Sequence, residues 1–158
     1  MIGQVGRIDP RTLPARPPSE VEWEELLVRL EIAPRALRIA VDEAPGGHPA
    51  VRDALMAGLA AELLAQSAIE AMAAGGAPES GLGVDAAGSD AELLSRLAAL
   101  RARTFAMVQR RGLNVWEWTT PGGVWPGATA YQVLLAAIHL DAALLDAVRR
   151  AGRREAGG

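Results

Sequence analysis

Residues 129–150 read TAYQVLLAAIHLDAALLDAVRR, and this stretch decides the fold class. Apolar residues recur in it every three or four positions, which is the period of an amphipathic α-helix. Thr129, with Gln132 three residues later, has the capping-box pattern that begins a helix. The sequence therefore predicts a helix from here to about Arg150, in which His139 is one of the few residues able to do chemistry.

The predicted helix is apolar on two sides. One face holds Tyr131, Leu134, Ile138, Ala142 and Leu145, and the other holds Val133, Ala137, Leu140, Leu144 and Val148. A single bundle core needs only one apolar stripe. We therefore expect the surplus face to be covered by the N-terminal arm, by a tryptophan-rich loop or by a second subunit.

The composition favours one all-α domain and excludes several classes of function. The chain has 158 residues, of which 50% are hydrophobic and only 4% aromatic, so alanine and leucine, both strong helix formers, must fill the core. A net charge of −3 disfavours nucleic-acid binding through a basic face. All 16 basic residues are arginine, which excludes lysine Schiff bases, and the lack of cysteine excludes disulfides, thiolate metal sites and cysteine nucleophiles.

Three further helices are predicted upstream. Ser19 and Ser89 each begin one, with a glutamate three residues later that completes a capping box. Pro34 is expected to kink the first of these helices or to break it. Between them, the second helix runs from about Pro49 to about Ala74, and Gly112 ends the third.

The connections predict how the helices are arranged. Only a few residues join the first two helices, which should therefore be antiparallel neighbours. The connection at 75–88 contains five glycines and is long enough to cross over along the bundle, which favours an up-down-down-up four-helix bundle. We expect an extended N-terminal arm at 1–18, the bundle at 19–151 and a flexible tail at 152–158. No secretory signal or membrane span is visible, so a cytoplasmic protein is expected.

The order of these pieces resembles the DinB-like superfamily of bacterial helical bundles, also called YfiT-like metal-dependent hydrolases. The likeness covers about 23–150. It includes a first helix interrupted by proline, LLVRLEIAPRALRIAVDEAP at 26–45, and a second helix, VRDALMAGLAAELLAQSAIEAM at 51–72. RLAALRARTFAMVQRRG at 96–112 then leads into a loop with tryptophans, and ATAYQVLLAAIHLDAALLDAVRR at 128–150 resembles the closing helix of the family.

The resemblance implies a divalent-metal site from which most ligands are missing. The family binds its metal through a histidine on the second helix and two residues one turn apart on the fourth. His139 matches the first position on the fourth helix, whereas Ala143 takes the second and Gly58 takes the position on the second helix. Alanine and glycine have no donor atoms, and one imidazole cannot hold a metal that needs about three protein ligands. The sequence therefore predicts no metal, no other cofactor and no catalytic residue.

A displaced site is the alternative. Glu62, His139 and Asp146 lie at spacings that would let them form a histidine-and-carboxylate site for zinc, nickel or iron. The simpler expectation is that Glu62 pairs with an arginine at the end of the bundle and that Asp146 is a solvated helix residue. His48 is expected to be a surface or capping residue. The loop aromatics Trp116, Trp118 and Trp125 are expected to anchor the long connection to the bundle.

The sequence leads to one main hypothesis on function. It describes a non-catalytic protein with a degenerate metal site, which binds a small apolar ligand or a protein partner and pairs as a homodimer. The alternative is a metal-dependent hydrolase or thiol-cofactor S-transferase that uses relocated ligands. A structural dimer without a ligand is the third possibility.

Overall fold

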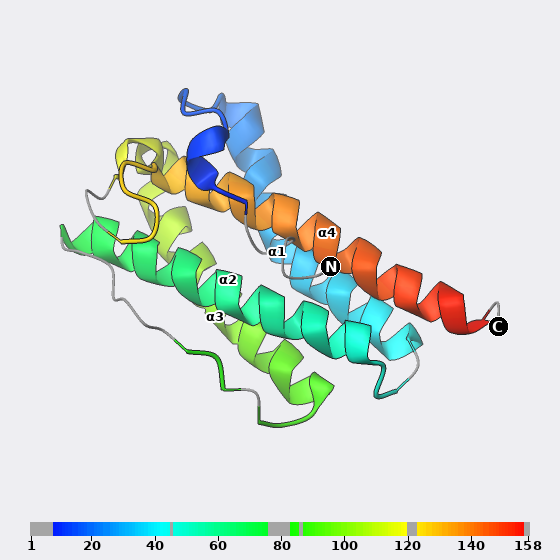
Figure 1. The fold of residues 1–158 in the computed structure, drawn as a ribbon. Coiled ribbons are helices and arrows are strands. Elements are labelled where there is room, and N and C mark those ends of the chain that lie inside the picture. The colour runs from blue at the N-terminus through cyan, green and yellow to red at the C-terminus, as the bar shows by residue number, and fades with distance from the viewer. Residues whose placement is uncertain (1–7, 45, 76–82, 86, 120–122, 157–158) are drawn as a thin grey trace.

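The computed structural model describes residues 8–44, 46–75, 83–85, 87–119 and 123–156. In this part of the chain, four long helices pack side by side (Figure 1). They are α1 (Glu20–Glu43), α2 (Pro49–Ala74), α3 (Asp90–Arg111) and α4 (Ala130–Ala156), with short 3₁₀ turns η2 (Pro10–Thr12) and η3 (Gly112–Glu117). The predicted all-α four-helix bundle is confirmed.

The four helices occupy the corners of the bundle in an order that the sequence did not predict. α1 packs against α3 and α4, and α2 packs against the same two helices. α1 and α2 therefore lie at opposite corners and meet only across the core, where Leu37 of α1 and Leu55 of α2 belong to one hydrophobic cluster. The prediction that they are neighbours was wrong, because a short loop only requires that the end of one helix and the start of the next come close.

Ion pairs between helices show which ones run in the same direction. Arg52 and Asp90, 3.3 Å apart, join the start of α2 to the start of α3, and Glu70 and Arg103, also 3.3 Å apart, join their later parts. These two helices therefore run parallel, and the chain between them returns to the end of the bundle at which α2 begins. Figure 1 shows α1 and α4 running in the opposite direction.

The helices begin where the capping patterns predicted. The Ser19 hydroxyl accepts a hydrogen bond from the Glu22 amide, and the Glu22 carboxylate accepts one from the Ser19 amide, both at 3.1 Å. Thr129 and Gln132 form the same reciprocal pair at the start of α4. At α2, the His48 ring nitrogen Nδ1 accepts from the Ala50 amide at 3.1 Å, so this histidine is a capping residue. Each bond satisfies an amide that the helix itself leaves without a partner.

The capping box of α1 predicts a dependence of stability on pH. The guanidinium of Arg16, together with the Ser19 amide, lowers the pKa of the Glu22 carboxyl from 4.5 to about 2. A lowered pKa in the folded state stabilises the protein above the unfolded-state value, and this contribution is lost as the pH falls from 4.5 to about 2. Glu22→Gln should therefore be less stable than the wild type at neutral pH, with the difference shrinking as the pH approaches 2. Urea unfolding of both proteins across this range measures it, and a difference independent of pH would contradict the prediction.

The two ends of the domain differ in part from the expected boundaries. α4 continues to Ala156, so the boundary predicted at residue 151 falls inside the helix. Ala151 is buried, and Gly152 lies next to Ala44 of α1, so packing supports this last part of α4 beyond the predicted end. In the N-terminal arm, the Leu13 carbonyl accepts a hydrogen bond of 2.8 Å from the side chain of Gln132, which holds the described part of the arm on α4.

Two helices are long and apolar enough to cross a membrane by length and composition. They are Pro49–Ala74 and Ala130–Arg154, of whose most apolar windows 56% and 44% are buried in the bundle. The central helices of a bundle core meet the same criterion, so this is weak evidence for a membrane span.

Candidate functional site

A single arginine in the interior joins all four helices. Arg101 of α3 is 4% exposed, and its guanidinium makes five hydrogen bonds. It donates to both carboxylate oxygens of Glu62 on α2 and to both of Asp141 on α4, each at 2.9 Å. The fifth bond, of 3.0 Å, reaches the carbonyl of Leu30 on α1. A guanidinium has five N–H groups, so every one of them has a partner.

Pro34 explains why the Leu30 carbonyl accepts this bond. In an uninterrupted helix, a carbonyl accepts from the amide four residues later, and Pro34 has no amide hydrogen to donate. α1 nevertheless continues through Pro34 as one helix. Arg101 thus supplies the donor that the proline removes, which links the interruption in α1 to the charged cluster in the core.

The cluster formed by Arg101, Glu62 and Asp141, hereafter the Arg101 cluster, carries a net negative charge when all three groups are ionised. Burial by itself lowers the pKa of Arg101, but attraction to Glu62 and hydrogen bonds with Asp141 outweigh this effect, so the pKa is raised overall. The side chain of Glu62 is 5% exposed and that of Asp141 is 17% exposed. One buried and one partly buried carboxylate therefore share one permanently charged guanidinium.

A cavity of about 30 Å³ adjoins the Arg101 cluster between α2 and α4. Its walls include the small side chains of Ala61, Ala65 and Ala137, and all three members of the cluster contribute to its lining. Ile8 of the arm and Trp125 of the long connection also line it. The cavity is large enough for at least one water molecule, and the carboxylates have lone pairs left to accept hydrogen bonds from an occupant.

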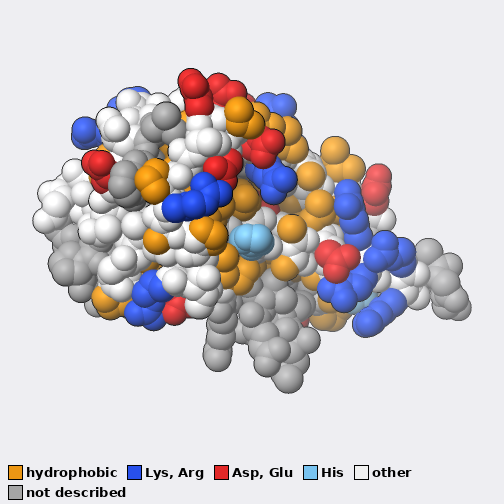
Figure 2. All heavy atoms as spheres, turned by 90° about the horizontal axis from the view of Figure 1, so that it is seen from above, with side chains coloured by type: hydrophobic (Ala, Val, Ile, Leu, Met, Phe, Trp, Pro, Cys, Tyr) orange, Lys and Arg blue, Asp and Glu red, His pale blue; other side chains and the backbone are white. Residues whose placement is uncertain are grey.

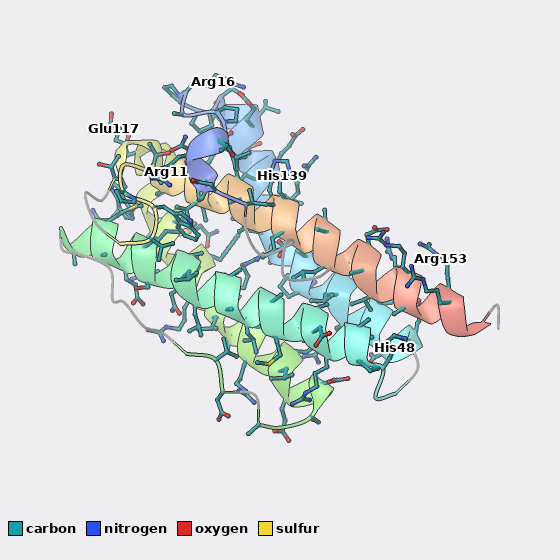
Figure 3. The ribbon with its side chains drawn as sticks, in the orientation of Figure 1. Arg11, Arg16, His48, Glu117, His139 and Arg153 are labelled. Carbon is teal, nitrogen blue, oxygen red and sulfur yellow. The ribbon has the colours of Figure 1, made fainter. Side chains whose placement is uncertain are left out.

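The positions to which the sequence resemblance assigned metal ligands do not surround one point. Gly58 is buried, and a Cβ built on it would lie 2.8 Å from Leu97 Cδ1 and 2.9 Å from Leu144 Cδ1. His139, by contrast, is exposed, and Figure 3 shows it on the outer side of α4. The resemblance implied an inward-facing metal ligand at His139, and the structure does not place it there. Each residue turns a helix by about 100°, and the buried side of α4 is centred on Leu140 and Leu144.

The three residues of the alternative metal site are not brought together either. Glu62 is held by Arg101, as the simpler expectation of an arginine partner predicted. Asp146 is exposed and pairs with Arg150 at 2.7 Å, one turn along α4. Within the described ranges, no group of three histidine, cysteine, aspartate or glutamate side chains is placed to hold a metal ion.

Sequence reasoning missed two members of the Arg101 cluster. Arg101 lies one turn from Leu97 and one turn from Thr104, both of which are buried, so its place on the inward side of α3 could have been found. Asp141 lies four residues after Ala137 and three before Leu144 on the predicted core face of α4. With Glu62 already placed inward on α2, an arginine and a second carboxylate on facing helices would have indicated a buried ionic cluster.

The described loop aromatics lie against the bundle as expected, whereas part of the second apolar face of α4 is not covered within the chain. Trp118 and Trp125 pack against the hydrophobic core, and Arg111 lies over the Trp118 ring at 5.4 Å from its centre. The side chain of Trp116 lies outside the described residues. Ile138, Ala142 and Leu145 of the surplus face instead line an open groove between α4 and α1.

No protein-family model matches the chain, and neither a curated protein nor a solved structure matches it.

Proposed function

We propose that this protein is a non-catalytic helical bundle that binds a small molecule in the cavity beside the Arg101 cluster. The ligand class that fits both the lining and a volume of about 30 Å³ is a very small cation, such as ammonium or methylammonium. The observation that supports this proposal is a cavity walled by alanines and lined at one side by a buried ionic cluster with an excess negative charge.

The chemistry of the lining favours a cation over an anion or a neutral molecule. All five donors of Arg101 are used within the protein, so the guanidinium has no N–H left for a ligand anion. Glu62 and Asp141 can each accept further hydrogen bonds. A ligand ammonium would compensate the excess charge, and its apolar part would contact the alanine walls, as is usual in ligand pockets.

The proposal that the site is non-catalytic rests on how its charged groups are held. Both carboxylates accept paired hydrogen bonds from the same guanidinium, so each already has a fixed partner within the protein. A carboxylate held in this way is not free to approach the reacting atom of a substrate. The degenerate relationship to the DinB-like family remains part of this proposal, supported by the order of the sequence segments and by the proline within α1.

Alkylammonium ions test the proposal directly. We expect ammonium and methylammonium to raise the unfolding temperature in a saturable manner, because a ligand that binds only the folded state stabilises it. Butylammonium, which is too large for a cavity of about 30 Å³, should not. The alcohols of matching length should have no such effect. A change in tryptophan fluorescence is also expected, since Trp125 lines the cavity.

Neighbouring alanines on α2 provide a matched pair of variants. Ala61 lines the cavity and Ala60 is exposed, so Ala61→Leu should fill the site whereas Ala60→Leu should not. We expect Ala61→Leu to weaken binding by about tenfold or more, since the added methyl groups occupy the ligand's place. Equal binding to both variants, or no binding of any ion of the series to the wild type, would refute the proposed site.

A further inference from the structure

The outer face of α1 carries large hydrophobic side chains that the bundle does not cover. Val21 is 65% exposed, Val28 and Ile32 are each 52% exposed, and Ile39 is 59% exposed. All four lie on the side of α1 opposite to the fully buried Leu30. Figure 2 shows one side of the molecule, where hydrophobic side chains reach the surface among acidic and basic ones.

Two charged residues complete the pattern of this face. Glu25 lies between Val21 and Val28, and Arg35 lies between Ile32 and Ile39; both are exposed. With them, the face has alternating steps of four and three residues, which is the seam of a coiled coil. We name this set the α1 seam; its members are Val21, Glu25, Val28, Ile32, Arg35 and Ile39.

The α1 seam is symmetric about Leu30. Val28 and Ile32 lie two residues to either side of it, and Val21 and Ile39 lie nine residues away. The charged pair, Glu25 and Arg35, lies five residues away with opposite signs. A surface that matches itself after reversal is what a two-fold interface between identical chains requires.

We propose that two copies of this chain pair through the α1 seam, with their α1 helices antiparallel about a two-fold axis at the level of Leu30. This arrangement places Val28 against Ile32 of the second copy. It also places Glu25 of each copy against Arg35 of the other copy, so this pair of opposite charges forms twice in the dimer. In a parallel pairing, Glu25 would instead face Glu25 of the second copy, and Arg35 would face Arg35. Like charges that face each other in an interface are unfavourable.

The surroundings of the α1 seam extend the apolar surface. Beside Ile32, a groove of about 320 Å³ between α1 and α4 is lined by Ile138, Ala142 and Leu145, the uncovered part of the second apolar face of α4. At the other flank, the antiparallel arrangement brings Glu24 near Arg38 of the second copy, and both residues are exposed. Charge complementarity and the symmetry of the seam thus identify a second copy as the occupant.

Charge exchange in the α1 seam provides the test. Light scattering of the wild type at micromolar concentration should give twice the chain mass of 16.5 kDa. Glu25→Arg and Arg35→Glu should each place like charges at both positions where residue 25 of one copy faces residue 35 of the other. Each should raise the dissociation constant of the dimer by more than about tenfold. The double variant restores opposite charges, so it should return to a dimer. Both residues are exposed, and circular dichroism checks that every variant is folded.

Cysteine pairing tests the register, since the chain has no cysteine of its own. A mixture of Val28→Cys and Ile32→Cys proteins should form a disulfide-linked heterodimer under mild oxidation, and a mixture of Val28→Cys with Ile39→Cys should not. A monomeric wild type would overturn the proposal. It would also be overturned by a dimer whose dissociation constant is the same in the wild type and in both charge-exchange variants. The ligand cavity lies between α2 and α4, so either result leaves the alkylammonium test unaffected.

Discussion

Arg101→Met is expected to lower the free energy of unfolding by about 3–5 kcal/mol, the range found when one partner of a buried ion pair is removed. The variant keeps an apolar side chain of similar length but leaves Glu62 and Asp141 without their shared counter-charge. It also leaves the Leu30 carbonyl without a donor, because Pro34 cannot supply one. Chemical denaturation monitored by circular dichroism measures the loss.

Arg103→Met is the matched control for this variant. Arg103 lies two residues further along α3, where it pairs with Glu70 at 3.3 Å on the exposed surface. Exposed ion pairs contribute about 0–1 kcal/mol, so this variant should remain close to the wild type. Equal losses from the two substitutions would mean that the Arg101 cluster has no special part in stability.

Gly58→His is expected to destabilise the bundle by about 3 kcal/mol or more, because overpacking forces side chains and backbone to move. A Cβ at this position already lies within 3 Å of Leu97 and Leu144, and an imidazole extends well beyond the Cβ. This is the position at which the sequence resemblance would place the metal-binding histidine of the second helix. The packing of α2 against α3 and α4 here thus leaves no room for that ligand without rearrangement.

Ala60→His provides the reference for helix propensity and bulk. Ala60 is exposed on the same helix, two residues further along, so its replacement should cost no more than about 0.7 kcal/mol. If Gly58→His unfolds at the same denaturant concentration as Ala60→His, the close approach of the three helices at Gly58 is not a packing constraint.

The sequence predicted the elements of this fold better than their arrangement. Capping residues act locally, so Ser19, His48 and Thr129 marked helix starts without knowledge of the tertiary structure. The diagonal placement of α1 and α2 depends on how α3 and α4 fill the space between them, and a loop length does not contain that information.

The candidate site was predicted only in part, and the reason lies in helix α4. Its two apolar faces left the direction of His139 open, and the resemblance suggested an inward direction that packing does not support. Glu62 was placed correctly and its pairing with an arginine was expected. The arginine itself was not identified, because a charged residue is not expected on the inward side of a helix, and Arg101 turns into the core.

The Arg101 cluster and the α1 seam meet at the same level of α1. The Leu30 carbonyl accepts from Arg101 on the inner side, and the proposed two-fold axis passes the outer side at this residue. Pro34 removes one hydrogen bond within α1, and Arg101 replaces it from a neighbouring helix. The continuity of α1, and with it of the α1 seam, across the proline is therefore expected to depend on the Arg101 cluster.

A double-mutant cycle between Arg101→Met and Glu62→Gln tests most directly whether one buried guanidinium holds the bundle together. Free energies of unfolding of the wild type, both single variants and the double variant yield the coupling energy. We predict a coupling of about 2–3 kcal/mol, because the neutral glutamine relieves the unpaired charge that Arg101→Met leaves behind. Losses that add to within about 0.5 kcal/mol would contradict the account.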